Sequence, residues 1–331
     1  MNFYVKRLFL NSNYKSNESV EKTIYIKSNN CYIKNKFLNT LSNKFYNIKT
    51  NYLYFHDDFK TNYINTILMP ELNLYISSTI TKDPKHTIDL NSTIKNYSKE
   101  NIQLTKNIIN STKQKFFSTI FEINKLFTKI CKKSSNNLDI IKFNNFKNDF
   151  IDCIFKNSEN NNNFKISEYF VSSIGIEGFK TFSNHLPNGE NKVFVINDNF
   201  NLFKCLLIDE IINKANFLNI SYEIYKNPLN PRIIDHIKIP SINLCIISNT
   251  FLFKEKIPGI QINEENFLKN EFENKKLLEQ KRDLNNLIEI LNSLCKELRK
   301  NYSILDDFFE NCIIENKFNN LIDDTLKNVI R

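Results

Sequence analysis

The chain has 331 residues, enough for about two domains of ordinary size, and 41% of them are hydrophobic, as in a globular protein. Only 4 residues are glycine, where average usage of about 7% gives roughly 23, and the first of them is Gly175. Glycine-rich phosphate loops and dinucleotide fingerprints need glycine for positive φ angles and close backbone approach. The first half of the chain therefore contains no intact loop of either kind.

The formal net charge of the chain is +9, from 45 Lys and Arg against 36 Asp and Glu. Such a charge is typical of proteins that bind nucleic acid or anionic lipid. Here most of it comes from scattered lysine, and arginine, the better reader of bases and phosphates, is rare. This distribution argues against dedicated nucleic-acid binding, which we keep as a second alternative function.

The 7 cysteines are widely spaced and include no C-x-x-C pair. This pattern is typical of reduced thiols in the cytoplasm and not of a disulfide framework or a zinc site. No apolar run approaches the about 18 residues that a membrane-spanning helix needs. We therefore expect a cytoplasmic protein with no metal site and no membrane contact.

In chain order, the first half predicts short apolar strands separated by helices, which is typical of a buried parallel sheet. The predicted elements are a strand near Arg7–Leu10, a strand at Thr23–Ile26, a helix at Ile33–Phe45, a strand at Asn51–His56, an irregular stretch, a strand at Leu72–Ser77, and long helices from about Ser92.

The second half repeats the first at an offset of 170 residues. Three separated segment pairs share this offset: 69–79 with 239–250, 23–26 with 193–196, and 52–55 with 222–225. A single offset that holds across three segments indicates a duplication. We predict one repeat at 1–157, an Asn-rich linker at 158–164 and a second repeat at 165–331, with four strands in each repeat.

Apolar residues recur every seven positions in the helical part of each repeat. They are Ile102, Ile109, Phe116, Ile123 and Ile130 in the first, and Leu277, Leu284, Leu291, Leu298 and Leu305 in the second. Additional apolar positions widen each stripe, so it predicts a helix face turned toward a core. We favour packing within the chain, and self-association or binding of a protein partner through these helices is the alternative.

Strand, loop, helix and two further strands are the layout of a phosphate-loop nucleotide-binding domain. With the segment Ile67–Leu74, ILMPELNL, this layout resembles the tandem-duplicated P-loop ATPases of low-GC Gram-positive bacteria, often labelled ATPase or nucleotide kinase. The resemblance covers nearly the whole chain. It implies an α/β fold of two tandem P-loop-like halves with mostly parallel sheets and appended helical hairpins, and it implies ATP and Mg²⁺ as ligands.

The first repeat departs from the family pattern in its phosphate loop, Lys27–Asn35. Ser28 and Ile33 stand where the resemblance places glycine, and Asn35 stands where it places the magnesium-binding hydroxyl. Lys34 falls on the phosphate-contacting lysine. A phosphate nest needs backbone N–H groups turned inward, through conformations that a β-branched residue disfavours.

The second repeat departs in the same way at Asn197–Cys205. Asp198 and Phe203 replace the glycines, Cys205 replaces the hydroxyl, and Lys204 again keeps the lysine position. Asp198 also adds negative charge at a site meant for polyphosphate. The acidic residue that should end the next strand and hold Mg²⁺ is Ser78 in one repeat and Ser248 in the other.

Two further residues match the family pattern in a single repeat. His56 falls on its histidine after the second strand, and Asp235, next to His236, falls on its aspartate in the irregular segment. The other repeat has Lys226 and Asn65 at these positions, which argues against a shared catalytic role.

The sequence thus predicts a degenerate, catalytically inactive homologue of the tandem ATPases that acts as a binding, regulatory or structural module. It assigns no catalytic and no metal-ligating residue. Lys34, Asn35, Lys204 and Cys205 are the candidate cofactor-binding residues. The alternative is an ATPase or nucleotide kinase that binds ATP and Mg²⁺ at an altered phosphate site.

Overall fold

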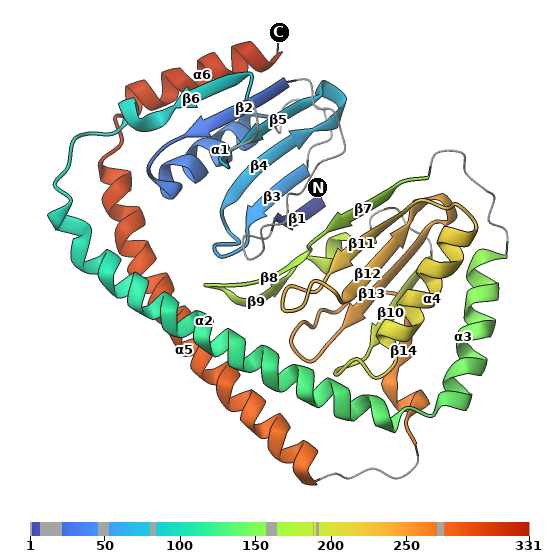
Figure 1. Cartoon of the computed structure of the whole chain (residues 1–331). Coiled ribbons are helices and arrows are strands. Elements are labelled where there is room, and N and C mark those ends of the chain that lie inside the picture. The colour runs from blue at the N-terminus through green and yellow to red at the C-terminus, as the bar shows by residue number, and fades with distance from the viewer. Residues whose placement is uncertain are drawn as a thin grey trace. The chain divides into compact units, whose positions relative to one another are not determined.

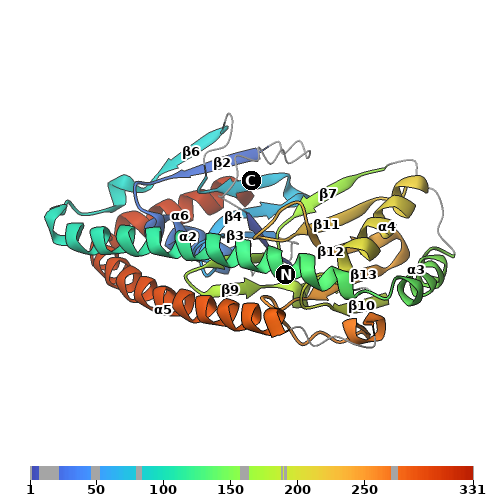
Figure 2. The same cartoon turned by 60° about the horizontal axis from the view of Figure 1, so that its bottom comes forward.

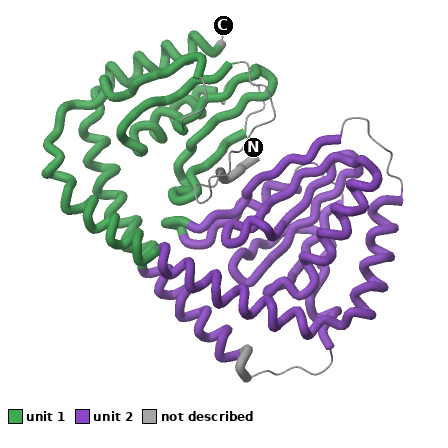
Figure 3. Tube along the Cα trace, in the orientation of Figure 1, with its two compact units in different colours: residues 1–116, 175–177, 294–331 green, residues 117–174, 178–293 purple. Residues whose placement is uncertain are grey.

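The computed structural model describes residues 2–6, 22–45, 53–79, 84–156, 164–187, 189, 192–269 and 275–330. The chain forms two compact units, each assembled from segments that are distant in sequence (Figure 3). Unit 1 consists of residues 1–116, 175–177 and 294–331, and unit 2 consists of residues 117–174 and 178–293.

The first half of the chain supplies one six-stranded sheet and three helices (Figure 1). Its elements are β1 (Asn2–Lys6), β2 (Lys22–Lys27), α1 (Cys31–Phe45), β3 (Leu53–Asp57), β4 (Ile64–Met69), β5 (Leu74–Ser77), β6 (His86–Asp89), α2 (Glu100–Ser134) and α3 (Ile140–Phe155).

The second half supplies another six-stranded sheet, a two-stranded hairpin and three helices. Its elements are β7 (Ile166–Tyr169), β8 (Ser172–Gly175), β9 (Gly178–Thr181), β10 (Lys192–Asn197), α4 (Lys204–Phe217), β11 (Tyr222–Lys226), β12 (Ile234–Ile239), β13 (Leu244–Asn249), β14 (Ile260–Asn263), α5 (Lys275–Asn311) and α6 (Glu315–Ile330).

The two six-stranded sheets have the same strand order. One runs β1-β3-β4-β5-β2-β6, and the other runs β7-β11-β12-β13-β10-β14. The segments that share the 170-residue offset lie at equivalent positions, because β10, β11 and β13 take the places of β2, β3 and β5. Each β4-type strand is followed by a short 3-10 helix that ends in a left-handed asparagine, Asn73 or Asn243.

The predicted α/β class is confirmed, but the expectation of mostly parallel sheets is wrong, because both sheets are mixed. β4 and β12 run antiparallel to both of their neighbours. Each of them follows a short turn after the preceding strand, and a short turn joins antiparallel strands, whereas a parallel pair needs a long crossover. The predicted count of four strands per repeat is also wrong, because each sheet has six strands. The stretch that was expected to be irregular contains β4, and β6 is short and largely exposed, so it shows no apolar pattern. The predicted strand at 7–10 lies outside the described residues.

The helices that complete each unit come from the opposite half of the sequence. In unit 2, α3 lies alongside α4 (Figures 1 and 2), and Phe143 packs against Phe203 and Phe267. In unit 1, α6 packs on α1 through Phe318 and Phe37, whose ring centroids are 5.8 Å apart. The two predicted repeats therefore describe the sequence and not the compact units. Each compact unit combines the sheet of one repeat with the terminal helix of the other repeat, α6 in unit 1 and α3 in unit 2. The predicted linker falls almost entirely outside the described residues.

The two long helices contribute residues to both units, because α2 passes from unit 1 to unit 2 after Phe116 and α5 passes from unit 2 to unit 1 after Ser293. Within unit 1 they are joined by Thr112, whose hydroxyl donates a 3.0 Å hydrogen bond to Glu297. The predicted stripes are buried in the chain at Ile102, Ile109, Phe116, Ile123, Ile130, Leu284, Leu291, Leu298 and Leu305.

We predict that Phe143→Ala destabilises the protein by about 3–5 kcal/mol, because it removes a buried ring that joins α3 to the core of unit 2. The matched control is Ile141→Ala on the same helix, since Ile141 is 72% exposed. Urea unfolding measures the free energy of unfolding of both variants. Equal losses would contradict the assignment of α3 to this core.

Candidate functional site

The N-terminus of α4 is closed by a carboxylate of the chain itself. Asp198 follows β10 directly and is fully buried. Its side chain accepts hydrogen bonds from the backbone N–H groups of Leu202 at 2.7 Å, Phe203 at 2.8 Å and Lys204 at 2.8 Å. These N–H groups are the unsatisfied donors of a helix start, where the helix dipole also favours negative charge. The anion-binding position of this loop is therefore occupied from within.

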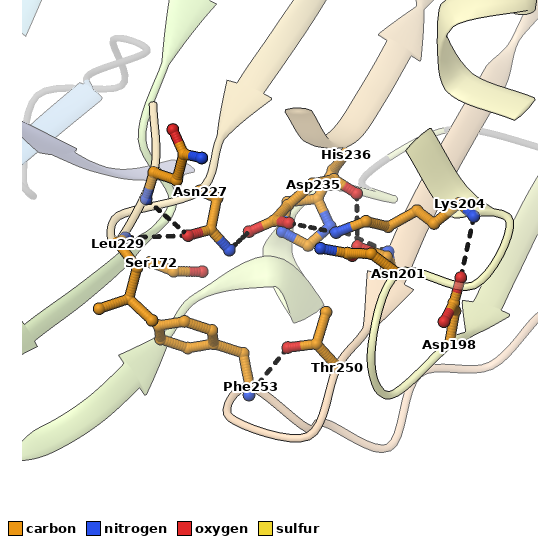
Figure 4. A network of polar contacts seen from close by, with 12 residues as sticks. Ser172, Asp198, Asn201, Lys204, Asn227, Leu229, Asp235, His236, Thr250 and Phe253 are labelled. Atoms are coloured by element: carbon orange, nitrogen blue, oxygen red, sulfur yellow. Dashed lines mark hydrogen bonds and ion pairs between the residues drawn. The ribbon is translucent and has the colours of Figure 1, made fainter. Parts of the chain in front are cut away.

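The side chain of Lys204 is turned into the protein interior. It is fully buried, and its Nζ lies 2.5 Å from Oδ1 of Asp235, while Oδ2 of Asp235 accepts a 2.9 Å hydrogen bond from Asn227 (Figure 4). Burial acts most strongly and lowers the pKa of Lys204, but the charge and hydrogen bond of Asp235, together with the charges of Cys205 and Asp198, outweigh it and raise the pKa above its ordinary value. Lys204 thus stays charged, and Asp235 compensates that charge.

A second polar chain holds β12 against β13. Nδ1 of His236 accepts a 3.1 Å hydrogen bond from the backbone N–H of Ser248, and the hydroxyl of Ser248 donates to the backbone carbonyl of Asp235 at 2.5 Å. Burial lowers the pKa of His236 to about 4, against the opposing effect of the Asp235 charge. His236 is consequently neutral at physiological pH, and Ser248 is used within the sheet.

In unit 1 the equivalent loop is short. Only residues 28–30 separate β2 from α1, so Ile33 and Lys34 already lie in the first helical turn. The side chain of Asn30 accepts hydrogen bonds from the N–H groups of Tyr32 at 2.7 Å and Ile33 at 3.3 Å. A neutral amide therefore caps α1 where a charged carboxylate caps α4.

The structure divides the four predicted cofactor-binding residues between the two units. Lys34 is half-buried in unit 1, where its Nζ donates to the backbone carbonyl of Ser78 at 3.1 Å and burial lowers its pKa. Asn35 is buried, and its Oδ1 accepts a 2.8 Å hydrogen bond from the N–H of Ile64, which ties α1 to β4. In unit 2, Lys204 belongs to the buried ion pair, and Cys205 lines a cavity.

That cavity has a volume of about 250 Å³ and is formed by α2, the start of α4 and the loop between β11 and β12. Sequence reasoning did not find it, because its walls come from three distant segments. It also did not pair Lys204 with Asp235. The one available signal for the capping role of Asp198 was an aspartate shortly before a helix start.

No protein-family model, no curated protein and no solved structure matches this chain. Within the described residues, no helix combines the length and the apolar character that crossing a bilayer requires. The same residues contain no group of three or more His, Cys, Asp or Glu side chains placed to hold a metal ion.

We predict that Lys204→Met destabilises the protein by about 3–5 kcal/mol, because it leaves the charge of Asp235 buried and unpaired. Lys34→Met, at the equivalent position of unit 1, should cost about 1 kcal/mol, since it removes one partly solvated hydrogen bond. Urea unfolding compares the two variants.

Addition of Asp235→Asn to Lys204→Met should recover much of the loss, because the unpaired charge at position 235 is then removed and the amide oxygen still accepts from Asn227. If Lys34→Met and Lys204→Met lose the same stability, the buried pair has no special role.

We predict that the free energy of unfolding falls as the pH decreases from 6.5 to about 4. The pKa of His236 is about 4 in the native protein and 6.5 when unperturbed, so below pH 6.5 the unfolded chain takes up a proton that the native chain refuses. The full effect is about 3 kcal/mol for this residue. Chemical unfolding at several pH values measures the slope.

The variant His236→Asn should flatten this pH dependence, because the amide can still accept from Ser248 and does not titrate. His86→Asn is the matched control, since His86 is exposed on β6. A slope that is unchanged in His236→Asn would show that His236 does not contribute.

Proposed function

We propose that this protein is a degenerate homologue of the tandem P-loop ATPases that works as a phosphate-independent binding module. The observation that carries the proposal is the carboxylate of Asp198, which accepts three backbone N–H bonds at the start of α4. In a working phosphate loop such donors point at the nucleotide. Here they are already satisfied by a group of the same charge sign as phosphate.

Binding of a polyphosphate at this position would have to displace the Asp198 carboxylate. The displaced carboxylate would remain close to the incoming anion, and like charges at short distance repel. The nearby lysine supplies no compensation, because Lys204 is paired with Asp235 at 2.5 Å. The three N–H groups that bond to Asp198 are thus not available to ATP, and the charge of Lys204 is compensated by Asp235.

The unit 1 loop is the stronger candidate for the alternative function, ATP binding at an altered site. Lys34 is half-buried and bonded to a backbone carbonyl, so its charge is not neutralised by this contact. However, the loop has only residues 28–30, and the side chain of Asn30 takes two of the helix-start N–H groups. A three-residue connection is too short to wrap a phosphate in consecutive inward-facing N–H groups.

What the chain retains is a packed scaffold of two sheets covered by amphipathic helices. The apolar stripe of α2 is buried within the chain, which favours intramolecular packing of these helices over a dimerisation zipper. We therefore expect the proposed binding role to lie in the interior of a unit and not on the stripes of these helices.

We predict that millimolar ATP with Mg²⁺ does not raise the melting temperature of the protein. A ligand that binds only the native state stabilises it in proportion to the logarithm of its concentration, so the absence of a shift across a titration means the absence of binding. Differential scanning fluorimetry with and without Mg²⁺ makes the measurement. A concentration-dependent rise that Lys34→Met abolishes would instead establish the altered-site alternative.

A further inference from the structure

The cavity in unit 2 lies beside the buried Lys204–Asp235 pair. Its volume of about 250 Å³ exceeds the roughly 150 Å³ of an apolar cavity that accommodates benzene. Asn227 and Leu229 are buried in its wall, and the exposed residues Lys132 and Ser135 belong to its rim. The space is thus large enough for one substituted aromatic ring.

The equivalent positions in unit 1 carry a cluster of large side chains in mutual contact. Lys60 is 5% exposed, and its Nζ lies 3.1 Å from Oδ2 of Asp306 and 3.6 Å from the centroid of the Tyr63 ring. The hydroxyl of Tyr63 donates to the same carboxylate at 2.6 Å. Together they form an ion pair with a cation–π contact.

Unit 2 has smaller, uncharged residues at the three matching positions. Asn230 and Ile233 stand 170 residues after Lys60 and Tyr63, and Cys131 stands 175 residues before Asp306, the offset between the two long helices. All three line the cavity. The hollow therefore coincides with positions at which the two repeats differ in side-chain size and charge.

The lining of the cavity suits an uncharged ligand. It includes the carboxamides of Asn124, Asn201 and Asn230 and contains no carboxylate, so it offers nothing to pair with a cation. It also offers no uncompensated positive charge in its interior to an anion, because the buried Lys204 behind it is paired with Asp235. Only the exposed Lys132 at the rim is charged, and that charge is solvated.

One polar atom of the lining lacks a partner. Oδ1 of Asn201 is inaccessible to solvent and accepts no hydrogen bond from any described residue, while its Nδ2 makes only a long 3.9 Å contact with Sγ of Cys131. A buried acceptor without a donor costs about 1–3 kcal/mol. A small rotation of the Asn201 side chain that brings this oxygen to the cavity surface would let a ligand N–H satisfy it. The adjacent ring of Phe127 provides an apolar surface for a flat group.

We propose that the unit 2 cavity binds a small uncharged aromatic molecule that bears an amide or lactam group. The amide N–H reaches the carboxamide oxygens, and the ring lies among Phe127, Leu229 and Ile233. This inference rests on the proposed function, because it names the class of ligand that the proposed binding module takes. Its test does not involve ATP.

The experiment is calorimetric titration of the full chain with nicotinamide and with nicotinate, which have the same ring and differ in carrying a neutral amide or a carboxylate. We expect nicotinamide to bind and nicotinate to bind at least about tenfold more weakly, because its carboxylate has no N–H to give and must lose water. Absence of nicotinamide binding at millimolar concentration, or equal binding of both probes, overturns the proposal.

Ile233→Tyr, which introduces the unit 1 residue, should abolish nicotinamide binding by filling the cavity. The triple variant Ile233→Tyr, Asn230→Lys and Cys131→Asp rebuilds the whole unit 1 cluster. It replaces the single variant in the binding test if the single variant does not fold. Tyr63→Phe, in unit 1, is the matched control and should bind as the original chain does. Undiminished binding in a folded, filled variant would place the ligand elsewhere and overturn the assignment.

The ATP titration separates this proposal from the previous one. If ATP binds and nicotinamide also binds without competing with it, the proposed function fails while the cavity assignment stands. If neither binds, the cavity assignment fails while the phosphate-independent character of the protein stands.

Discussion

The interior of unit 2 is organised around a carboxylate that satisfies the start of a helix. Asp198 takes three N–H groups of α4, and this fixes the first turn so that Lys204 enters the core and meets Asp235. Asp235 in turn holds Asn227, whose Oδ1 accepts from the N–H groups of two residues in the loop that walls the cavity. Charge balance is what makes this chain of contacts possible, since an unpaired buried ion is far more costly than a paired one. The loop, the ion pair and the cavity wall thus depend on one another.

The two units solve the same structural problem with different chemistry. Each buries a lysine against an aspartate, but the lysine comes from the start of α4 in unit 2 and from the turn after β3 in unit 1. In unit 1, Lys60 and Asp306 fill the space beneath α5 with the help of Tyr63. In unit 2 the pair lies deeper and the space beneath α2 stays open. The two sheets thus share a strand order, while the polar interiors of the two units differ.

Local patterns predicted much of the fold but little of the site. The apolar runs of β2 and β10 and the seven-residue stripes of α2 and α5 follow from periodicity within each segment. A stripe shows that a helix is buried but not which sheet it covers, so the exchange of α3 and α6 had no local signal. Similarly, Lys204 was found by its place in a motif, whereas Asp235 lies 31 residues further along the chain and becomes its partner only through the sheet. Asp198 was recognised as a charge opposed to phosphate, and only its three hydrogen bonds show that it is a cap.

The exchange of terminal helices sets the order in which the units are completed during synthesis. Unit 2 needs nothing beyond residue 293, but unit 1 needs residues 294–331, including the α6 residue Phe318 that packs on Phe37. The unit 1 sheet and α1 are complete at Asp89, so the face of α1 that carries Phe37 waits for about 200 further residues, or roughly 10–40 s at about 5–20 residues per second. The half of the fold that is translated first is therefore the last to close. Until then the uncovered face of α1 exposes apolar surface, which favours aggregation of a nascent chain.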